Sequence, residues 1–239
     1  MTTLAQLRLL QLVSPALPVG AFSYSEGLEA LVQGGVLADG ARGIQSWLEG
    51  ELHRGALTIE AAALPSLMAA LRGWSGSDPG ACSIDPLAER EVVGELDGWL
   101  LAQREAAELR AQQRQMGRSL LQLTAELGWP LPAGGDGTPL RLAWPAAWAW
   151  AGVCLEIDPV DVVTGYLYSW VASQLSAGLR LMPLGPTEAQ RLQLALAPLI
   201  QGLGEQLART DPRGLWNGGV GASLAQLRHG ELYSRLFRS

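Results

Sequence analysis

The chain has 239 residues, of which 48% are hydrophobic and 17% charged, so it can bury a sizeable core and is not intrinsically disordered. Its formal net charge of -6 argues against general nucleic-acid binding. All 17 of its basic residues are arginine, which excludes a P-loop, Schiff-base or pyridoxal-phosphate lysine, and its 2 His and 2 Cys argue against a structural zinc site.

The first segment predicts a short helix followed by a structured loop. Leu4, Leu7, Leu10 and Leu12 recur with helical spacing. The uncharged run 9–25 after Arg8 is interrupted by prolines and glycine, so we favour this interpretation over a secretory signal. Ser23 and Glu26 then have the spacing of a capping box that starts a helix through about Gln33.

The remaining pattern is helical throughout, without useful strand-like alternation. Asp39 and Thr58 are expected to cap the next two helices, the first ending near Arg54. Loops are expected at 73–86 and 128–140, with a helical region between them that breaks near Gly94 or Gly98. Helices follow at about 143–156, 159–182 and 187–208, and an irregular stretch at 211–223. The predicted fold is an all-α, single-domain helical bundle of about eight to ten helices.

The helix expected from Asp158 contains the uncharged run 162–179, which is about as long as a minimal membrane span. Its hydroxyl and amide side chains favour a buried helix at the centre of the bundle instead. Small residues spaced four apart line one of its faces and leave a dimer seam as an alternative: Gly165, Ser169, Ser173 and Ala177.

Three arginines, Arg110, Arg114 and Arg118, are spaced four apart and share one helix face. This face is either solvated or a surface for an acidic partner. His53 is interpreted as structural rather than as a metal ligand, and no nucleophile motif supports a hydrolase. We therefore expect neither catalytic residues nor metal ligands in this chain.

The C-terminal tail is basic and aromatic within an acidic protein. From Glu205 onward there are five arginines against three acidic residues, and the tail carries Tyr233, Leu236 and Phe237. A tail of this composition either packs back on its own domain or docks on a partner.

Four ordered blocks of the sequence resemble the urease accessory protein UreF family. The first is Leu9 to Glu29, which contains the run Ser14-Pro15-Ala16-Leu17-Pro18-Val19-Gly20. The others are Glu108-Leu109-Arg110 with Met116-Gly117-Arg118, the stretch Arg180 to Gly185, and the tail through Tyr233 to Ser239. Pro186 and Gly230 depart from the usual pattern, which has glutamine and glutamate there.

The resemblance implies a non-enzymatic, cytoplasmic homodimer that joins UreD (or UreH) and the GTPase UreG to insert nickel into apo-urease. It implies neither a stably bound cofactor nor a nucleic-acid or membrane partner, because nickel is handled by the complex. We expect a domain over 1–223 and a partner-docking tail over 224–239. One alternative is an activator that lends UreG an arginine in trans, and another is an unrelated all-α ligand-binding protein. The expected partner-binding residues are Ser14, Pro15, Pro18, Gly20, Tyr24, Glu29, Arg110, Arg114, Arg118, Arg180, Arg228, His229, Tyr233, Arg235, Leu236 and Phe237.

Overall fold

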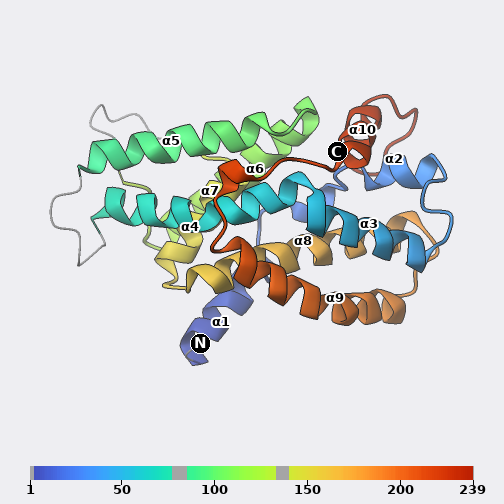
Figure 1. Ribbon diagram of the computed structural model, residues 1–239, viewed down its shortest axis with the longest axis horizontal. Helices are drawn as coiled ribbons and strands as arrows, with labels where there is room; N and C mark the ends of the chain where they lie inside the picture. The colour runs from blue at the N-terminus through green and yellow to red at the C-terminus, as the bar shows by residue number, and fades with distance from the viewer. Residues whose placement is uncertain (1–2, 77–84, 133–139, 239) are drawn as a thin grey trace.

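The computed structural model describes residues 3–76, 85–132 and 140–238. Within these ranges the chain forms ten α-helices and two short 3₁₀ helices, and no strand (Figure 1), which confirms the predicted all-α, single-domain bundle. The 3₁₀ helices are η1 (Ala21–Ser23) and η2 (Pro212–Gly214). The α-helices are α1 (Thr3–Leu12), α2 (Leu28–Gln33), α3 (Ala41–Arg54), α4 (Ala56–Ser75), α5 (Pro86–Ala102), α6 (Ala107–Glu126), α7 (Trp144–Cys154), α8 (Pro159–Leu181), α9 (Pro186–Leu207) and α10 (Val220–His229).

Prolines are the first residues of α5, α8 and α9, and α9 starts one residue earlier than expected. Proline suits the first helical turn because its fixed φ is helical and its missing N–H has no intrahelical acceptor there. Asp85 caps α5 by accepting a 2.9 Å hydrogen bond from the backbone N–H of Leu87, and Asp158 caps α8 in the same way through Val160, also at 2.9 Å.

Several other predicted helix boundaries are wrong. The capping box at Ser23 does not form, because Glu26 has φ 50° and α2 begins only at Leu28. The starts of α3 and α4 follow Gly40 and Gly55, so neither Asp39 nor Thr58 is a cap, and Thr58 is buried inside α4.

The break in the long helical region 86–127 also lies elsewhere than expected. It separates α5 from α6 at 103–106 rather than near Gly94 or Gly98. Arg110 holds this turn by donating to the backbone carbonyls of Arg104 (2.6 Å) and Glu105 (2.8 Å), an arrangement that spacing alone does not indicate.

The centre of the bundle is α4 rather than α8. Of the 20 residues of α4, 15 are buried, against 10 of 23 in α8, and α4 packs against α3, α5, α7 and α8. The predicted small-residue face of α8 contacts α1 at one position and lines a cavity at two others. Gly165 admits α1, since a Cβ there would lie 2.8 Å from Leu9 Cδ1, and Ser169 and Ser173 line a cavity.

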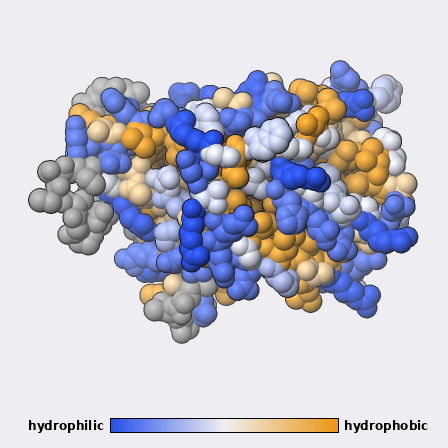
Figure 2. Space-filling view, viewed as in Figure 1, coloured by the Kyte–Doolittle hydropathy of each residue, from blue (hydrophilic) through white to orange (hydrophobic). Residues whose placement is uncertain are grey.

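The C-terminal segment lies at one end of the molecule, where α10 packs against α2, while the N-terminus on α1 lies elsewhere (Figure 1). This contact requires glycine at position 27, because a Cβ there would lie 2.9 Å from the backbone nitrogen of Gln226. The surface seen in Figure 2 is largely hydrophilic, with separate hydrophobic patches at both ends and near the middle of this face. None of the described helices is long and apolar enough to cross a membrane.

Candidate partner-docking site

The C-terminal tail is docked on its own domain, and the buried carboxylate of Glu29 on α2 is the main anchor. It accepts hydrogen bonds from the backbone N–H groups of Leu236 (2.7 Å) and Phe237 (3.0 Å). Glu29 is only 2% exposed, and charge-assisted bonds of this kind are among the stronger hydrogen bonds in proteins. One side chain near the start of the chain therefore fixes the backbone of its last residues.

His229, at the end of α10, joins two helices through a pair of carboxylates. Its Nε2 lies 3.3 Å from Glu29 Oε2 and its Nδ1 lies 3.0 Å from Glu108 Oε2, and the ring is completely buried. Each ring nitrogen faces one carboxylate oxygen, and which nitrogen donates depends on the tautomer of the ring. His229 is therefore a connector between α2, α6 and the tail.

Glu108, in the first turn of α6, also binds the tail through Arg235 at 2.6 Å. Burial alone would raise the pKa of Glu108, but the hydrogen bonds from His229 and Arg235 outweigh it and lower that pKa. The ionised form of Glu108 is therefore favoured in the docked arrangement, in which this carboxylate contacts both His229 and Arg235.

Further contacts hold the last residues against the N-terminal segment. The Arg180 guanidinium lies 4.4 Å from the centre of the Phe237 ring and donates to the carbonyl of Phe22 at 3.1 Å. The N–H of Arg238 donates to the carbonyl of Ser23 at 2.9 Å. Phe237 is buried, so the tail contributes to the hydrophobic core.

Docking of the tail leaves an apolar surface on the outer side of α10. Val220, Leu224 and Leu227 recur with helical spacing and are 63%, 50% and 47% exposed. Trp216, just before this helix, is 85% exposed, and Tyr233, just after it, is fully exposed. We call these five residues the α10 surface. Contiguous exposed apolar residues of this kind mark interaction sites in soluble proteins.

The structure brings six of the predicted partner-binding residues into one site: Glu29, Arg180, His229, Arg235, Leu236 and Phe237. Three more lie close to it in the chain, since Tyr24 is buried beside α2 and Tyr233 and Arg228 are exposed at the tail. The packing-back interpretation of the tail therefore holds for this chain, and the outward-facing residues remain candidates for partner binding.

The other predicted residues lie away from the tail. Ser14 and Pro15 line the cavity between α1 and α8, Pro18 is exposed, and Gly20 adopts φ 75° before η1. The predicted arginine face is divided, because Arg110 binds backbone carbonyls while Arg114 and Arg118 are exposed.

Sequence reasoning missed a buried charge cluster built around Glu60 of α4. Arg104 binds this carboxylate at 2.7 Å, the Tyr166 hydroxyl donates to it at 2.8 Å, and Gln113 donates to it at 3.2 Å. Burial lowers the pKa of Arg104, but Glu60 more than compensates and the net pKa is raised. Arg104, Gln113 and Tyr166 lie 44, 53 and 106 positions from Glu60 in the sequence, so no local spacing reveals the cluster.

Side chains suited to metal binding are scattered in this chain. No group of three or more His, Cys, Asp or Glu residues that could hold a metal occurs among the described residues. His53 is exposed near the end of α3, and burial raises the pKa of the Cys154 thiol to about 12, which keeps it protonated. Cys82 lies outside the described residues.

Comparison with known proteins gives one consistent family. The family model described as UreF matches residues 39–197. A urease accessory protein UreF from Microcystis aeruginosa is 40% identical over 231 residues, covering 97% of this chain and 96% of the relative. Its counterpart from Thermosynechococcus vestitus is 37% identical over 239 residues, covering both chains completely, and one from Prochlorococcus marinus (strain MIT 9301) is 33% identical over 228 residues, covering 95% of this chain and 96% of that one. The chain belongs to the UreF family of urease accessory proteins.

Proposed function

We propose that this chain is a non-enzymatic scaffold that joins a UreD- or UreH-type protein and the GTPase UreG for GTP-dependent nickel insertion into apo-urease. The observation that carries this proposal is the docked tail. Glu29, Glu108 and His229 hold the tail in one position, and the α10 surface then presents apolar side chains outward. Exposed aromatic anchors on a rigid element suit a protein partner.

The UreD- or UreH-type protein is the proposed occupant of the α10 surface. Trp216 and Tyr233 supply large amphipathic side chains, which dominate binding energy in many interfaces. Arg228 and Arg235 lie at its edge and add positive charge. An ordered surface binds with a smaller entropic cost than a free tail.

Deleting residues 228–239 tests this proposal in a cell that expresses the urease accessory proteins. The deletion removes His229, Arg235 and the two N–H donors to Glu29. We expect the UreD- or UreH-type partner to be lost from the purified complex while circular dichroism stays helical. Undiminished recovery of that partner with the shortened chain would refute the role of the tail.

A second proposed role, lending an arginine to UreG in trans, is favoured by the exposure of Arg114 and Arg118 on α6. Arg110 and Arg180 are less suited because each binds a backbone carbonyl within this chain. An arginine supplied in trans is worth roughly 10³–10⁵ in GTPase rate. Alanine variants of Arg114 and Arg118 should then abolish the stimulated turnover of UreG. Unchanged turnover in both variants would refute the arginine role and leave the scaffold role as the only proposal.

The homodimer and the cytoplasmic location also belong to this proposal. The exposed side chains of Leu4 and Leu7 on α1 give an apolar area that a second copy of the chain can cover. Light scattering on the purified chain should give twice the monomer mass. Leu7→Glu should return it to a monomer.

A further inference from the structure

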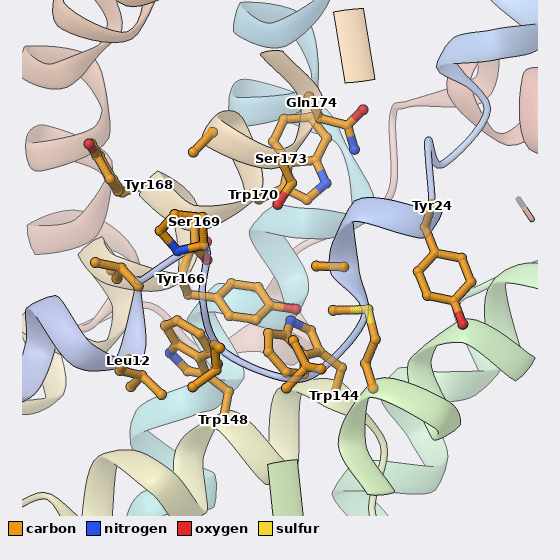
Figure 3. A pocket seen from close by; sticks show the side chains of 18 of the residues that line it. Leu12, Tyr24, Trp144, Trp148, Tyr166, Tyr168, Ser169, Trp170, Ser173 and Gln174 are labelled. Carbon is orange, nitrogen blue, oxygen red and sulfur yellow. Dashed lines mark hydrogen bonds between the residues drawn. The ribbon is translucent and has the colours of Figure 1, made fainter. Parts of the chain in front are cut away.

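A cavity of about 710 Å³ opens between the segment that runs from α1 to α2 and the helices α6, α7 and α8 (Figure 3). Its volume falls within the range of small-molecule sites in proteins, roughly 300–1,000 Å³. The tail and the α10 surface take no part in its walls. The function proposed above therefore leaves this cavity without a role.

Aromatic side chains form much of the cavity wall. Trp144 and Trp148 pack at 5.3 Å between ring centres, and Trp148 meets Tyr166 edge-on at 5.6 Å. Trp170 faces the same space from α8 (Figure 3). Indole and phenol faces carry negative electrostatic potential, so an organic cation is attracted to such a wall.

The inner end of the cavity is acidic. Glu26 and Glu60 both line it, and Arg104 is the cation among its lining residues. Arg104 is fully engaged by Glu60, through Nε at 2.7 Å and the second nitrogen at 2.7 Å. Two carboxylates are therefore balanced by one guanidinium when both are ionised, and the excess negative charge lies at Glu26.

Two amide oxygens among the residues that line the cavity have no hydrogen-bond partner. Gln113 donates its Nε2 to Glu60, which leaves its Oε1 buried and without a partner. The Oε1 atom of Gln174, on α8, is likewise buried and unpaired. Buried polar atoms in folded proteins almost always have partners, so the vacant acceptors point to a ligand that donates. Gln113 and Gln174 are 3% and 2% exposed.

We propose that this cavity binds a small organic cation, an apolar or aromatic body that ends in a primary ammonium or guanidinium group. The cationic end lies at Glu26 and the Gln113 carbonyl oxygen, and the apolar body lies between the tryptophans. The mouth, lined by the exposed side chains of Leu10, Phe22 and Tyr168, admits the ligand from solvent. An anionic ligand is disfavoured because Arg104 is already paired.

Release of protons on binding is a second observable consequence of this proposal, because it reports the ionisation of Glu26. Burial raises the pKa of Glu26, and the opposing effects of Arg104 and the hydrogen bond from Trp170 do not cancel it. A cation placed beside this carboxylate favours its ionised form. Binding should therefore release protons at a pH where free Glu26 is partly protonated.

The test uses the purified full-length chain with 4-phenylbutylamine and, as its neutral counterpart, 4-phenylbutan-1-ol. Calorimetry and tryptophan fluorescence should give an affinity for the amine at least about tenfold above that for the alcohol, since hydrogen bonds to ions are roughly twice as strong as neutral ones. Calorimetry in buffers of different ionisation enthalpy should show proton release with the amine alone. Equal affinities, or no saturable binding of the amine at millimolar concentration, would overturn the proposal.

Two variants locate the site. Glu26→Gln should weaken amine binding about tenfold and leave alcohol binding unchanged, and Glu188→Gln, on the exposed side of α9, should change neither. Ser173→Phe, which fills the wall from α8, should weaken both ligands and keeps the test valid if Glu26→Gln fails to fold. Amine affinity unaltered by both cavity variants would place binding elsewhere and refute the assignment.

Discussion

Glu26 lies just before α2 and Glu29 lies in its first turn, yet the two carboxylates face different regions of the molecule. Glu29 faces the tail and accepts hydrogen bonds from the backbone N–H groups of Leu236 and Phe237. Glu26 faces the cavity and receives side-chain donors, Gln112 at 2.9 Å and Trp170 at 3.0 Å. One carboxylate orders a chain segment, and the other remains available at the end of an open space.

The difference shows how the partners of a buried carboxylate determine its role. Backbone donors from a distant segment make Glu29 an anchor, because its loss would leave those donors unpaired. Glu26 is incompletely compensated, and burial raises its pKa. Substitutions at these two positions and at their neighbours should therefore change the stability of the fold and of the docked tail with different signs and by different amounts.

The largest expected loss of stability comes from a substitution in the buried charge cluster around Glu60, next to Glu26. Arg104→Met leaves Glu60, which is 2% exposed, as a buried charge without its ionic partner. Removing one member of a buried pair costs about 3–5 kcal/mol. Urea unfolding should show this loss, and Arg118→Met on the exposed side of α6 should show almost none. Equal stability of the two variants would contradict the role assigned to the cluster.

The next effect is on the tail. Glu29→Ala removes the acceptor for two backbone N–H groups and a contact to His229, so the tail should undock while the bundle stays folded. Hydrogen exchange at the amides of Leu236 and Phe237 should accelerate about 10- to 100-fold, corresponding to roughly 1.4–3 kcal/mol. Glu205→Ala on α9 is the control, and slow exchange at these amides in Glu29→Ala would refute the anchor.

A smaller effect distinguishes Glu26 from Glu29 through the pH dependence of the free energy of unfolding. A raised carboxyl pKa means that the folded state binds the proton more tightly than the unfolded state, so stability falls as pH rises above the ordinary glutamate pKa. Glu26→Gln should therefore gain stability relative to the unsubstituted chain at pH 8, by on the order of 1 kcal/mol, and lose that gain near pH 4.

Glu29→Gln should instead be less stable at pH 8, because its amide nitrogen replaces an acceptor with a donor. Burial raises the pKa of Asp97 to about 6, which adds the same slope to every variant. Burial also raises the pKa of Glu51 to about 7 with a contribution from the charge of Glu26, so Glu26→Gln relieves Glu51 as well and the gain at pH 8 includes both effects. The differences between variants then report positions 26 and 29, the former together with Glu51. The same sign for both glutamine variants at pH 8 would contradict the comparison.

The smallest effect concerns Arg180. Arg180→Ala removes a cation–π contact to Phe237 and a hydrogen bond to the Phe22 carbonyl at an exposed position. The expected loss is about 0.5–1 kcal/mol. Exchange of the Phe237 amide should accelerate severalfold, less than in Glu29→Ala, whereas Arg191→Ala on α9 should leave it unchanged. A larger effect than that of Glu29→Ala would make Arg180 the main anchor instead.

Local sequence signals predicted the helices with clear starts. Asp85 and Asp158 cap helices whose first residues are Pro86 and Pro159, and these boundaries follow from the residues alone. Ser23 and Glu26 have an equally good local pattern, but the Glu26 carboxylate binds Trp170 and Gln112 instead of the backbone. A tertiary contact overrides the capping preference there.

The site was only partly predictable for the same reason. Tail composition and resemblance to the UreF family selected Glu29, His229 and Arg235 as candidates, but the contact of His229 with Glu29 spans 200 positions. The cluster of Glu60, Arg104 and Tyr166 has no local pattern, because it forms only when α4, α8 and the turn between α5 and α6 come together. Such sites require the fold before their residues can be recognised.

The most direct test of the account is the affinity of the UreD- or UreH-type partner for full-length chains that differ only at Glu29. The claim is that Glu29 orders the tail and thereby presents the α10 surface. Glu29→Ala should weaken the complex at least about tenfold, and Glu188→Ala should bind like the unsubstituted chain. Equal affinity for all three chains, together with an undocked tail in Glu29→Ala, would contradict the claim.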